Sequence, residues 1–379
     1  WARKVNGKLA YFGPVVPGAK DFGAGAALDL YQERRTDLEA GRTPRPKIEG
    51  VAVADVCDAF LVAKDDALAR GEIVRRTRIE YEATTDRLVA FFGKDRLVDD
   101  LRGDDFAKLR KVFAKGRGAH ALANEIRRTK TVFKYAFDAE LIDRPVRFGP
   151  GFKPPSKKVF RQLRQQAGRK MFEPEEIHLL LDAAGPQVKA MILLAANTGF
   201  GNADVGLLPL KALDLKGGWV EFPRPKTAVP RRCPLWPETI AALEAYLARR
   251  PKPKDRKLAG RVFITKYGGS WYKDTFDNPI ANEFAKLLKG IDESRAEEAR
   301  KKRRRAPEPL QRPGRGFYAL RHGFQTAGDG AKDPIAVRFI MGHADLGNDM
   351  SAVYREGVDD DRLLAVTEHV RRWLFGEQD

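Results

Sequence analysis

Apolar residues recur at helical spacing between about residue 50 and residue 147. They appear every three or four positions, separated by stretches rich in charged residues. This spacing is typical of amphipathic helices that turn one apolar face toward a shared core. Asp104 and Asp105 mark the start of one such helix, because carboxylates are favoured near a helix N-terminus. We predict an all-helical body, with its apolar faces formed by Val53, Val56, Phe60, Leu61, Tyr81, Leu88, Phe92, Phe106, Leu109, Val112, Ile126, Val132 and Phe133.

The first 47 residues have a different pattern. Asn6-Gly7 separates two short runs, and this dipeptide favours the tight turn of a β-hairpin. Leu28, Tyr31 and Leu38 then fall at roughly helical spacing within residues 26–40. The pattern predicts a small module of two strands and one helix, which is too small to bury a large core.

A second compact body is predicted from residue 172 onward. Residues 172–176 combine a proline with acidic residues, as helix starts often do, and residues 190–196 form a continuous apolar run. A helix is expected over residues 239–250, and short strands over 218–222, 232–235 and 261–264. The predicted fold class is therefore α+β and mainly helical.

Between the two bodies lies a basic stretch, residues 149–171, that contains no acidic residue. Its prolines predict an extended linker, and an extended cationic linker can follow a phosphate backbone. A plain spacer would not need this charge. The sequence thus predicts four parts, residues 1–47, 48–148, 149–171 and 172–379. The candidate DNA contacts of the linker are Lys153, Lys157, Lys158, Arg161 and Arg164.

The charge balance points to a polyanionic partner. Among 379 residues, 70 are Lys or Arg and 52 are Asp or Glu, so the formal net charge is +18. Such an excess favours nucleic acid, since binding releases condensed counterions. Arg127, Arg128 and Lys130, on the helix expected over residues 119–141, are further candidate contacts. The alternative for any one helix is an ordinary solvated face. The run Lys301–Arg305 is similarly either a solvated helix end or a phosphate-contacting insertion.

Several other classes of protein are excluded. Two cysteines, Cys57 and Cys233, are too few for a disulfide framework or a Cys-rich zinc module. The five histidines do not fall at metal-ligand spacing, so we expect neither a metal nor a cofactor. No apolar run is long enough to span a membrane, and no membrane partner is expected. No secretory signal follows Trp1, so we expect a cytoplasmic, nucleoid-associated protein.

The last third of the sequence carries an ordered series of residues. Lys226 lies in a turn before a Pro-Leu run, and Tyr318-x-x-Arg321 precedes an apolar helix. Gly342-His343 follows, and then Tyr354. In this order and spacing, roughly residues 172–375 resemble the tyrosine recombinase, or phage integrase, family.

The resemblance implies a chemistry for these residues. Tyr354 would attack a DNA phosphate and form a 3′-phosphotyrosyl link. Arg321 would hold the non-bridging oxygens, and Lys226 would protonate the 5′-hydroxyl leaving group. His343 would hydrogen-bond the phosphate or help to deprotonate the tyrosine, and Tyr318 would donate a hydrogen bond. No metal is needed, because side-chain cations replace it.

The resemblance also implies partners. Residues 48–148 would form a core DNA-binding domain, and residues 1–47 an arm-binding-like module. The protein would bind double-stranded DNA and self-associate on it as a dimer or tetramer. The apolar C-terminal stretch, with Leu363, Val370 and Leu374, packs either on a neighbouring copy or on its own domain.

Two positions depart from the family pattern. Gly201, in Thr198-Gly199-Phe200-Gly201, replaces the first arginine, and Tyr318 replaces a histidine. A cation from Arg224, Arg231 or Arg232 is expected to compensate, and Arg231 and Arg232 are also candidate DNA contacts. Asp204 either forms a salt bridge within the fold or acts chemically.

Two functions remain open on these residues. The first is a site-specific recombinase or integrase that cleaves and rejoins DNA. The second is a recombinase-fold protein with impaired catalysis, acting as an architectural or regulatory DNA-binding factor. A third reading, a basic scaffold for RNA or an acidic protein, has no supporting motif.

Overall fold

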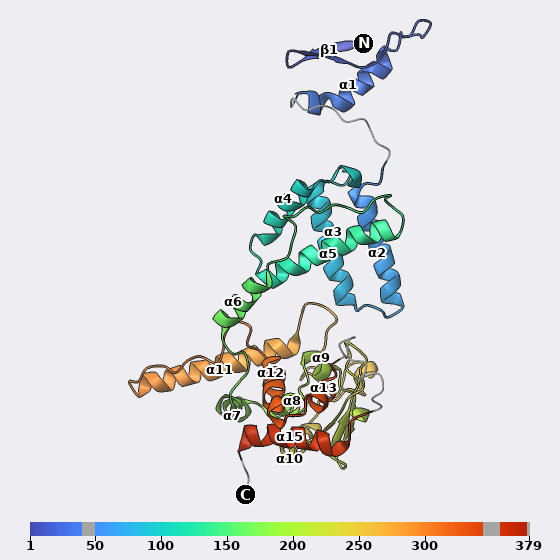
Figure 1. The fold of residues 1–379 in the computed structure, drawn as a ribbon. Helices are drawn as coiled ribbons and strands as arrows, with labels where there is room; N and C mark the ends of the chain where they lie inside the picture. Colours follow the sequence, from blue (N-terminus) through green and yellow to red (C-terminus); the bar gives the residue numbers. More distant parts are fainter. Residues whose placement is uncertain (40–49, 344–356, 377–379) are drawn as a thin grey trace. The chain divides into compact units, whose positions relative to one another are not determined.

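The computed structural model describes residues 1–39, 50–343 and 357–376. Within them the chain forms two compact units (Figure 1). One comprises Trp1–Asp66 and Tyr81–Pro154, and the other comprises Ala67–Glu80 and Pro155–Asp379. The described ranges contain no helix with both the length and the apolar character that crossing a membrane requires. The four-part division made from the sequence stays a prediction.

The N-terminal residues form the expected two strands and helix. Strands β1 (Ala2–Val5) and β2 (Lys8–Tyr11) pair antiparallel, and α1 (Ala24–Glu39) follows them. Asn6 and Gly7 both have positive φ, as the tight turn of a two-residue hairpin requires. Three residues form the small core, Phe12, Ala27 and Tyr31. This core is minimal, as the length of the segment predicted.

The next segment is all-helical, as predicted. Phenylalanine rings dominate its core, and Phe106 lies edge-on to Phe92, Phe133 and Phe148, with ring centroids 4.8–5.6 Å apart. Such edge-to-face pairs add to the stabilisation that burial gives. The helices are α2 (Val53–Ala69), α3 (Arg75–Phe92), α4 (Gly103–Ala114) and α5 (Ala119–Asp138), with a short 3₁₀ turn, η1 (Val98–Asp100), before α4.

The basic linker is not extended throughout, which corrects the expectation from its prolines. After Pro155, the chain forms an 11-residue helix, α6 (Lys157–Ala167). The Ser156 side chain caps it by accepting the Val159 N–H at 3.4 Å, and Gly168, with φ +66°, follows its last turn. The prolines end before the helix, so they restrict only the segment that precedes it. No residue of α6 is buried.

The core of the second unit is built around helix α8 (Pro186–Thr198). Every residue of α8 from Ala190 to Thr198 is buried. A three-stranded antiparallel sheet has the order β3-β4-β5, and Val220 of β4 pairs with Cys233 of β5. The strand expected over 261–264 forms only isolated bridges, from Arg261 to Pro209 and from Ile264 to Ser270. The other elements around α8 are α7 (Pro174–Ala183), α9 (Asn202–Leu207), η2 (Leu210–Ala212), β3 (Leu213–Asp214), β4 (Trp219–Glu221), β5 (Arg232–Pro234), α10 (Pro237–Leu247), η3 (Arg256–Leu258), α12 (Ala319–Gly328), η4 (Asp329–Ala331) and α13 (Pro334–Met341).

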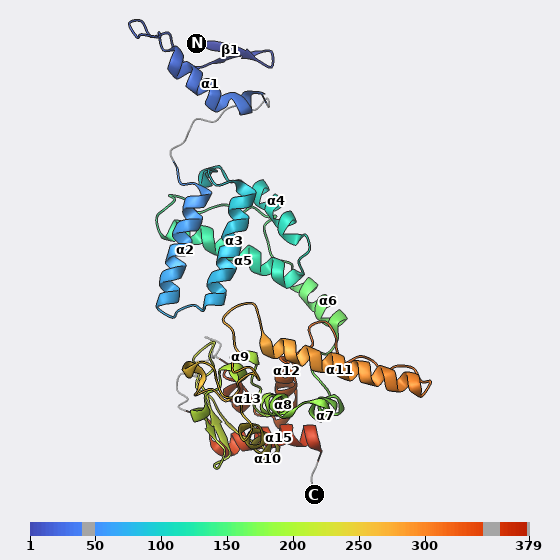
Figure 2. The ribbon, with the colours of Figure 1, turned by 180° about the vertical axis from the view of Figure 1, so that it is seen from behind.

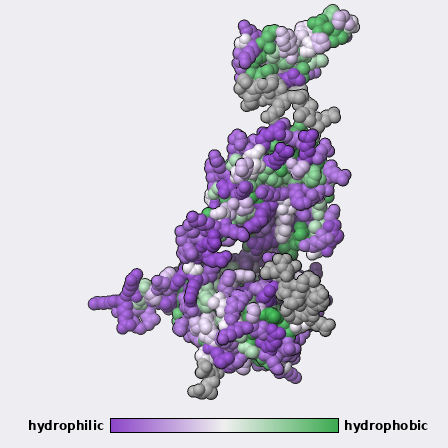
Figure 3. All heavy atoms as spheres, in the orientation of Figure 1, coloured by the Kyte–Doolittle hydropathy of each residue, from purple (hydrophilic) through white to green (hydrophobic). Residues whose placement is uncertain are grey.

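The long helix α11 (Pro279–Lys301) extends beyond the other helices of the second unit (Figures 1 and 2). Its first part buries Ile280, Phe284 and Leu288, whereas its far end projects away from the other helices of the unit. That end is almost continuously hydrophilic in Figure 3. Residues 301–305 are all exposed, which is compatible with both a solvated helix end and a phosphate-contacting insertion.

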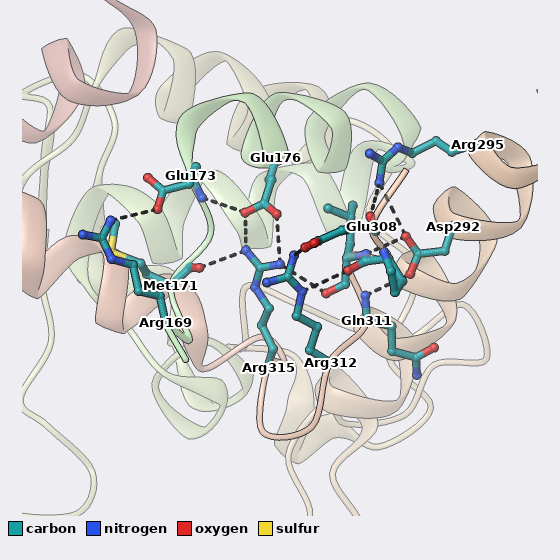
Figure 4. Close-up of polar contacts among 12 residues, drawn as sticks. Arg169, Met171, Glu173, Glu176, Asp292, Arg295, Glu308, Gln311, Arg312 and Arg315 are labelled. Atoms are coloured by element: carbon teal, nitrogen blue, oxygen red, sulfur yellow. Dashed lines mark hydrogen bonds and ion pairs between the residues drawn. The ribbon is translucent and has the colours of Figure 1, made fainter. Parts of the chain in front are cut away.

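A buried arginine ties the segment before α12 to the rest of the unit (Figure 4). Arg315 forms an ion pair with Glu176 of α7, and its guanidinium lies 4.2 Å from the centroid of the Phe172 ring. Asp292 of α11 accepts the backbone N–H groups of Leu310 and Gln311 at 2.7 and 2.9 Å. These contacts fix the approach to α12, which carries Arg321.

The C-terminal helix, α15 (Asp360–Phe375), packs on its own domain. Leu363, Val370 and Leu374 are buried in the core of the second unit. The indole N–H of Trp236 donates to the Thr367 carbonyl at 2.9 Å. Of the two arrangements left open by the sequence, the structure therefore has the intramolecular one.

Candidate active site

Arg321 is held at the meeting point of three helices. It lies in the first turn of α12 and is 3% exposed. Its Nη1 donates to the Gly199 carbonyl at the end of α8 (2.6 Å), and its Nη2 donates to the Met341 carbonyl at the end of α13 (2.8 Å). Burial, and then the charge of Arg224, lower the pKa of Arg321, but a guanidinium stays protonated at neutral pH. The site therefore contains a fixed, preorganised cation.

Gly342 and His343 come directly after α13. Gly342 ends this helix in the left-handed region, with φ +61°. His343 is partly buried, and burial followed by the charges of Arg321, Arg224 and Arg338 lowers the pKa of its imidazole to about 4. The ring is consequently neutral at pH 7, so one nitrogen can donate a hydrogen bond and the other can accept one.

The two departures from the family pattern lie against each other. A Cβ atom placed on Gly201 would be 3.1 Å from a carbon of the Tyr318 ring. The ring thus fills the space into which a side chain at position 201 would project. Tyr318 is 48% exposed and its ring also lies edge-on to His322, at 5.6 Å between centroids. The glycine and the tyrosine are sterically matched, and no cation comes from position 201.

A cation does come from the hairpin between β4 and β5. Arg231 is 3% exposed, and its guanidinium lies 4.2 Å from the centroid of the Phe200 ring. Its Nη2 donates to Asp204 Oδ1 and its Nε to the Phe222 carbonyl, both at 2.8 Å. Among the described residues, its buried Nη1 has no hydrogen-bond partner. Leaving a buried donor unpaired typically costs about 1–3 kcal/mol, so this atom needs an explanation.

The Asp204 carboxylate links Arg231 to Gly201, the position at which the family resemblance predicts an arginine. Its Oδ2 accepts the backbone N–H of Gly201 at 2.7 Å, while its Oδ1 binds Arg231. Of the two roles that the sequence left open for Asp204, the structure shows the salt bridge within the fold. The pairing of Asp204 with Arg231 was not predicted, because the two residues are 27 positions apart in the sequence.

The other hairpin cations have different surroundings. Arg224 Nη1 donates to the Gly342 carbonyl at 3.2 Å, which brings it to the site as well. Lys226 is exposed in the turn, and no ion pair of its side chain occurs within the described ranges. Arg232 instead binds Glu221 and Asp360, and its guanidinium lies 3.9 Å from the Trp219 ring centroid. Arg232 is thus paired with two acids, whereas Arg231 is paired with one and Arg224 donates to a backbone carbonyl.

The structure thus brings together part of the predicted site. Arg321, His343 and Tyr318 converge, and Arg224 and Arg231 join them from the hairpin that bears Lys226. Tyr354 lies outside the described residues. No group of three or more His, Cys, Asp or Glu side chains that could hold a metal occurs in the part of the chain that the structure describes.

The candidate DNA contacts outside this site are mostly exposed. Those of the linker are Lys153, Lys157, Lys158, Arg161 and Arg164, all exposed. On α5, Arg127 is exposed and donates to Asn124, whereas Arg128 pairs with the buried Glu125 at 3.6 Å. Lys130 lies 5.5 Å from the centroid of the Phe148 ring. Arg127 is therefore the most exposed of these three candidates on α5.

Comparison with known proteins identifies the fold. No protein-family model and no curated protein matches the sequence. Among solved structures, the Tn1549 transposon integrase bound to transposon right end DNA is similar, with TM-score 0.59 and 17% identity over 83% of this chain and 99% of that one. A complex of the same integrase with a circular intermediate DNA has TM-score 0.56 and 19% identity, over 83% of this chain and 98% of that one.

A lambda integrase tetramer bound to a Holliday junction is also similar, with TM-score 0.55 and 15% identity over 94% of this chain and 90% of that one. The similarity thus extends over nearly the whole length of the chains in these structures, which for the Tn1549 integrase comprise its residues 82–397. It agrees with the resemblance carried by Lys226, Arg321 and Gly342-His343. The chain has the fold of the tyrosine recombinases.

Proposed function

We propose that this protein is a site-specific DNA recombinase or integrase that cleaves and rejoins double-stranded DNA. The observation that carries the proposal is a cluster of cations around a neutral imidazole. Arg321 and His343 meet Arg224 and Arg231, which come from the hairpin that also bears Lys226. Such a cluster suits a phosphodiester, because guanidinium groups hold the non-bridging oxygens bidentately. The DNA-bound state of the similar integrases supports the same substrate.

In the proposed reaction, the phenolic oxygen of Tyr354 bonds to the phosphorus as the bond from phosphorus to the 5′ oxygen breaks. Lys226 gives its proton to that leaving oxygen, a general-acid step. Arg321 stabilises the charge that develops on the non-bridging oxygens. The phenolic proton of Tyr354 passes either to His343 or to solvent water, and in the second case His343 hydrogen-bonds the phosphate. The phosphotyrosyl link conserves the bond energy, so rejoining by a 5′ hydroxyl needs no nucleotide cofactor.

The exposed cations of the linker support the proposal that double-stranded DNA is the partner. α6 presents Lys157, Lys158, Arg161 and Arg164, and none of its residues is buried in the fold. The Holliday-junction complex of lambda integrase is a tetramer, which supports the further proposal that this chain self-associates on DNA as a dimer or tetramer.

The test is covalent trapping. Duplexes bound by the full chain are selected from a random library and nicked to make suicide substrates, from which cleavage releases a short fragment. We expect a protein–DNA adduct that survives denaturation and is absent in Tyr354→Phe. The matched control is Tyr267→Phe, which removes a hydroxyl from an exposed tyrosine of the same unit. It should leave the adduct unchanged.

A second function is favoured by Gly201, which supplies no side chain to the phosphate. This is a DNA-binding architectural or regulatory factor with impaired catalysis. It predicts salt-sensitive and site-selective binding, no adduct on any selected duplex, and no effect of Tyr354→Phe on binding. That combination of results would reject strand cleavage and leave the binding factor.

A further inference from the structure

Cleavage as proposed above builds negative charge on both non-bridging oxygens of the phosphate, so a cation beside each of them would stabilise it; this inference rests on that proposed function. Arg321 supplies one guanidinium. Position 201 supplies none, since it is glycine and the Tyr318 ring lies 3.1 Å from where its Cβ would be. A second cation therefore has to come from another element.

Arg231 lies at the place where that cation is needed. The carboxylate that holds its Nη2 also holds the backbone N–H of Gly201. Arg231 also lies against Gly342, because Arg231 Cδ is 2.5 Å from the position that a Cβ of Gly342 would occupy. Arg321 donates to the carbonyl of Met341, the residue directly before Gly342. Both arginines therefore lie against the Met341–Gly342 segment.

Arg231 is also built as a preorganised donor. The Phe200 ring, the Asp204 carboxylate and the Phe222 carbonyl fix three sides of its guanidinium. Its remaining nitrogen, Nη1, is buried and has no hydrogen-bond partner among the described residues. A fixed guanidinium with one unused donor beside a second guanidinium is an arrangement that an anion would complete.

We propose that Arg231 is a catalytic arginine whose Nη1 binds a non-bridging oxygen of the scissile phosphate, so that the hairpin supplies the charge absent at Gly201. Arg231 keeps its proton throughout, and acts only on the charge that develops as the tyrosine oxygen bonds to phosphorus. Asp204 is a positioning residue, because it acts through Arg231.

The experiment measures adduct formation by the full chain on two forms of one nicked duplex. The first carries the natural phosphate at the cleavage position, and the second carries a methylphosphonate there, which lacks one non-bridging charge. We expect Arg231→Ala to slow cleavage of the phosphate about 10²–10³-fold, the usual loss for one preorganised donor. On at least one methylphosphonate diastereomer, the loss should shrink to less than about tenfold, because the charge that Arg231 stabilises is gone.

Arg315→Gln is the matched control for the cost of removing a buried arginine. Arg315 resembles Arg231 in being buried, in pairing with a carboxylate and in lying 4.2 Å from a phenylalanine ring centroid. Any loss it causes comes through folding, so it should be equal on the two substrates. Duplex binding before cleavage, measured for each variant, reports whether the fold is intact.

Three results would overturn the assignment. An equal loss on both substrates in Arg231→Ala would make Arg231 structural. A loss that depends on the substrate in Arg224→Ala, but not in Arg231→Ala, would assign the second cation to Arg224. No adduct from the unaltered chain would reject the proposed function itself, an outcome distinct from the other two.

Discussion

Gly342 has no side chain, and Arg231 fills the space beside it. A Cβ at this position would lie 2.5 Å from Arg231 Cδ and 3.1 Å from Arg224 Cβ, on a backbone with φ +61°. The Arg231 side chain cannot easily withdraw, because Asp204 and the Phe200 ring hold its far end. The glycine is therefore required both for the end of α13 and for the position of the hairpin arginine.

We expect Gly342→Ala to destabilise the protein by more than about 1 kcal/mol, because strain and overlap add, and to slow adduct formation. Denaturant unfolding and the trapping assay measure the two effects. Gly218→Ala is the control, since Gly218 has φ +77° and its Cβ would meet only Ile240, at 3.9 Å. If the two variants behave alike, backbone strain alone explains the loss and the packing on Arg231 is unimportant.

His343 gives a prediction about pH. Burial and three neighbouring arginines lower the pKa of its imidazole from 6.5 to about 4. Between these values the unfolded chain binds a proton that the folded chain does not, so His343 makes the free energy of unfolding fall as the pH drops from about 6.5 to about 4. Above pH 7 both states are neutral and the contribution is constant.

The comparison of the unaltered chain with His343→Gln isolates the contribution of His343 to the free energy of unfolding. The difference in the free energy of unfolding between the two proteins should be flat above pH 7 and should change across the window from 6.5 to 4. Nuclear magnetic resonance titration of the His343 ring gives the folded pKa directly. A midpoint near 6.5 would contradict the electrostatic description of the site.

At the scale of elements, the sequence pattern predicted most helices, the N-terminal hairpin and strands β4 and β5, but it did not predict β3 and it was wrong about residues 261–264. α5 buries side chains at regular intervals and α8 buries a continuous apolar run, so both patterns are visible in the sequence. The sheet has strands of two or three residues, too short for any alternation. The apolar residues 262–264 favour the prediction of a strand over 261–264. In the structure, Arg261 and Ile264 form only isolated bridges, to Pro209 and Ser270.

α6 was missed for a different reason. The prolines of the linker predict an extended segment, but they restrict only the residues near them and none lies within α6. The sequence after Pro155 contains the signals of a helix, a Ser156 cap, good helix formers and a glycine at position 168. Local capping signals would have identified the element.

The site was predictable to the extent that its residues are ordered along the chain. Tyr318, Arg321 and Gly342-His343 could be recognised by spacing, and the structure brings them together. The bond between Arg231 and Asp204 could not be predicted in the same way, because it depends on how the hairpin folds back onto α9. The sequence offered three hairpin arginines, and only burial and partners distinguish them.

For the whole molecule, the excess of 18 positive charges leaves open which cations contact DNA. Two exposed basic clusters can be compared, the α6 residues Lys157, Lys158, Arg161 and Arg164, and the helix end Lys301–Arg305. The second cluster follows acidic residues at positions 292, 293, 297 and 298, and Lys301 pairs with Glu297 at 2.8 Å. The linker from residue 149 to 171 contains no acid at all. We therefore expect phosphate contacts from α6 and not from the end of α11.

Neutralising four cations in each cluster tests this expectation at equal net charge. One variant changes Lys157, Lys158, Arg161 and Arg164 to Gln, and the other changes Lys301, Arg303, Arg304 and Arg305 to Gln. Each phosphate contact contributes about 0.9 to the slope of log affinity against log salt, so the α6 variant should lose up to about 3.6 of that slope and the α11 variant less than about 1. Glutamine has a helix propensity close to that of lysine and arginine, and α6 buries no residue, so its fold should persist. Equal losses would mean that binding senses total charge only, whereas a larger loss in the α11 variant would make the helix end the phosphate-contacting insertion.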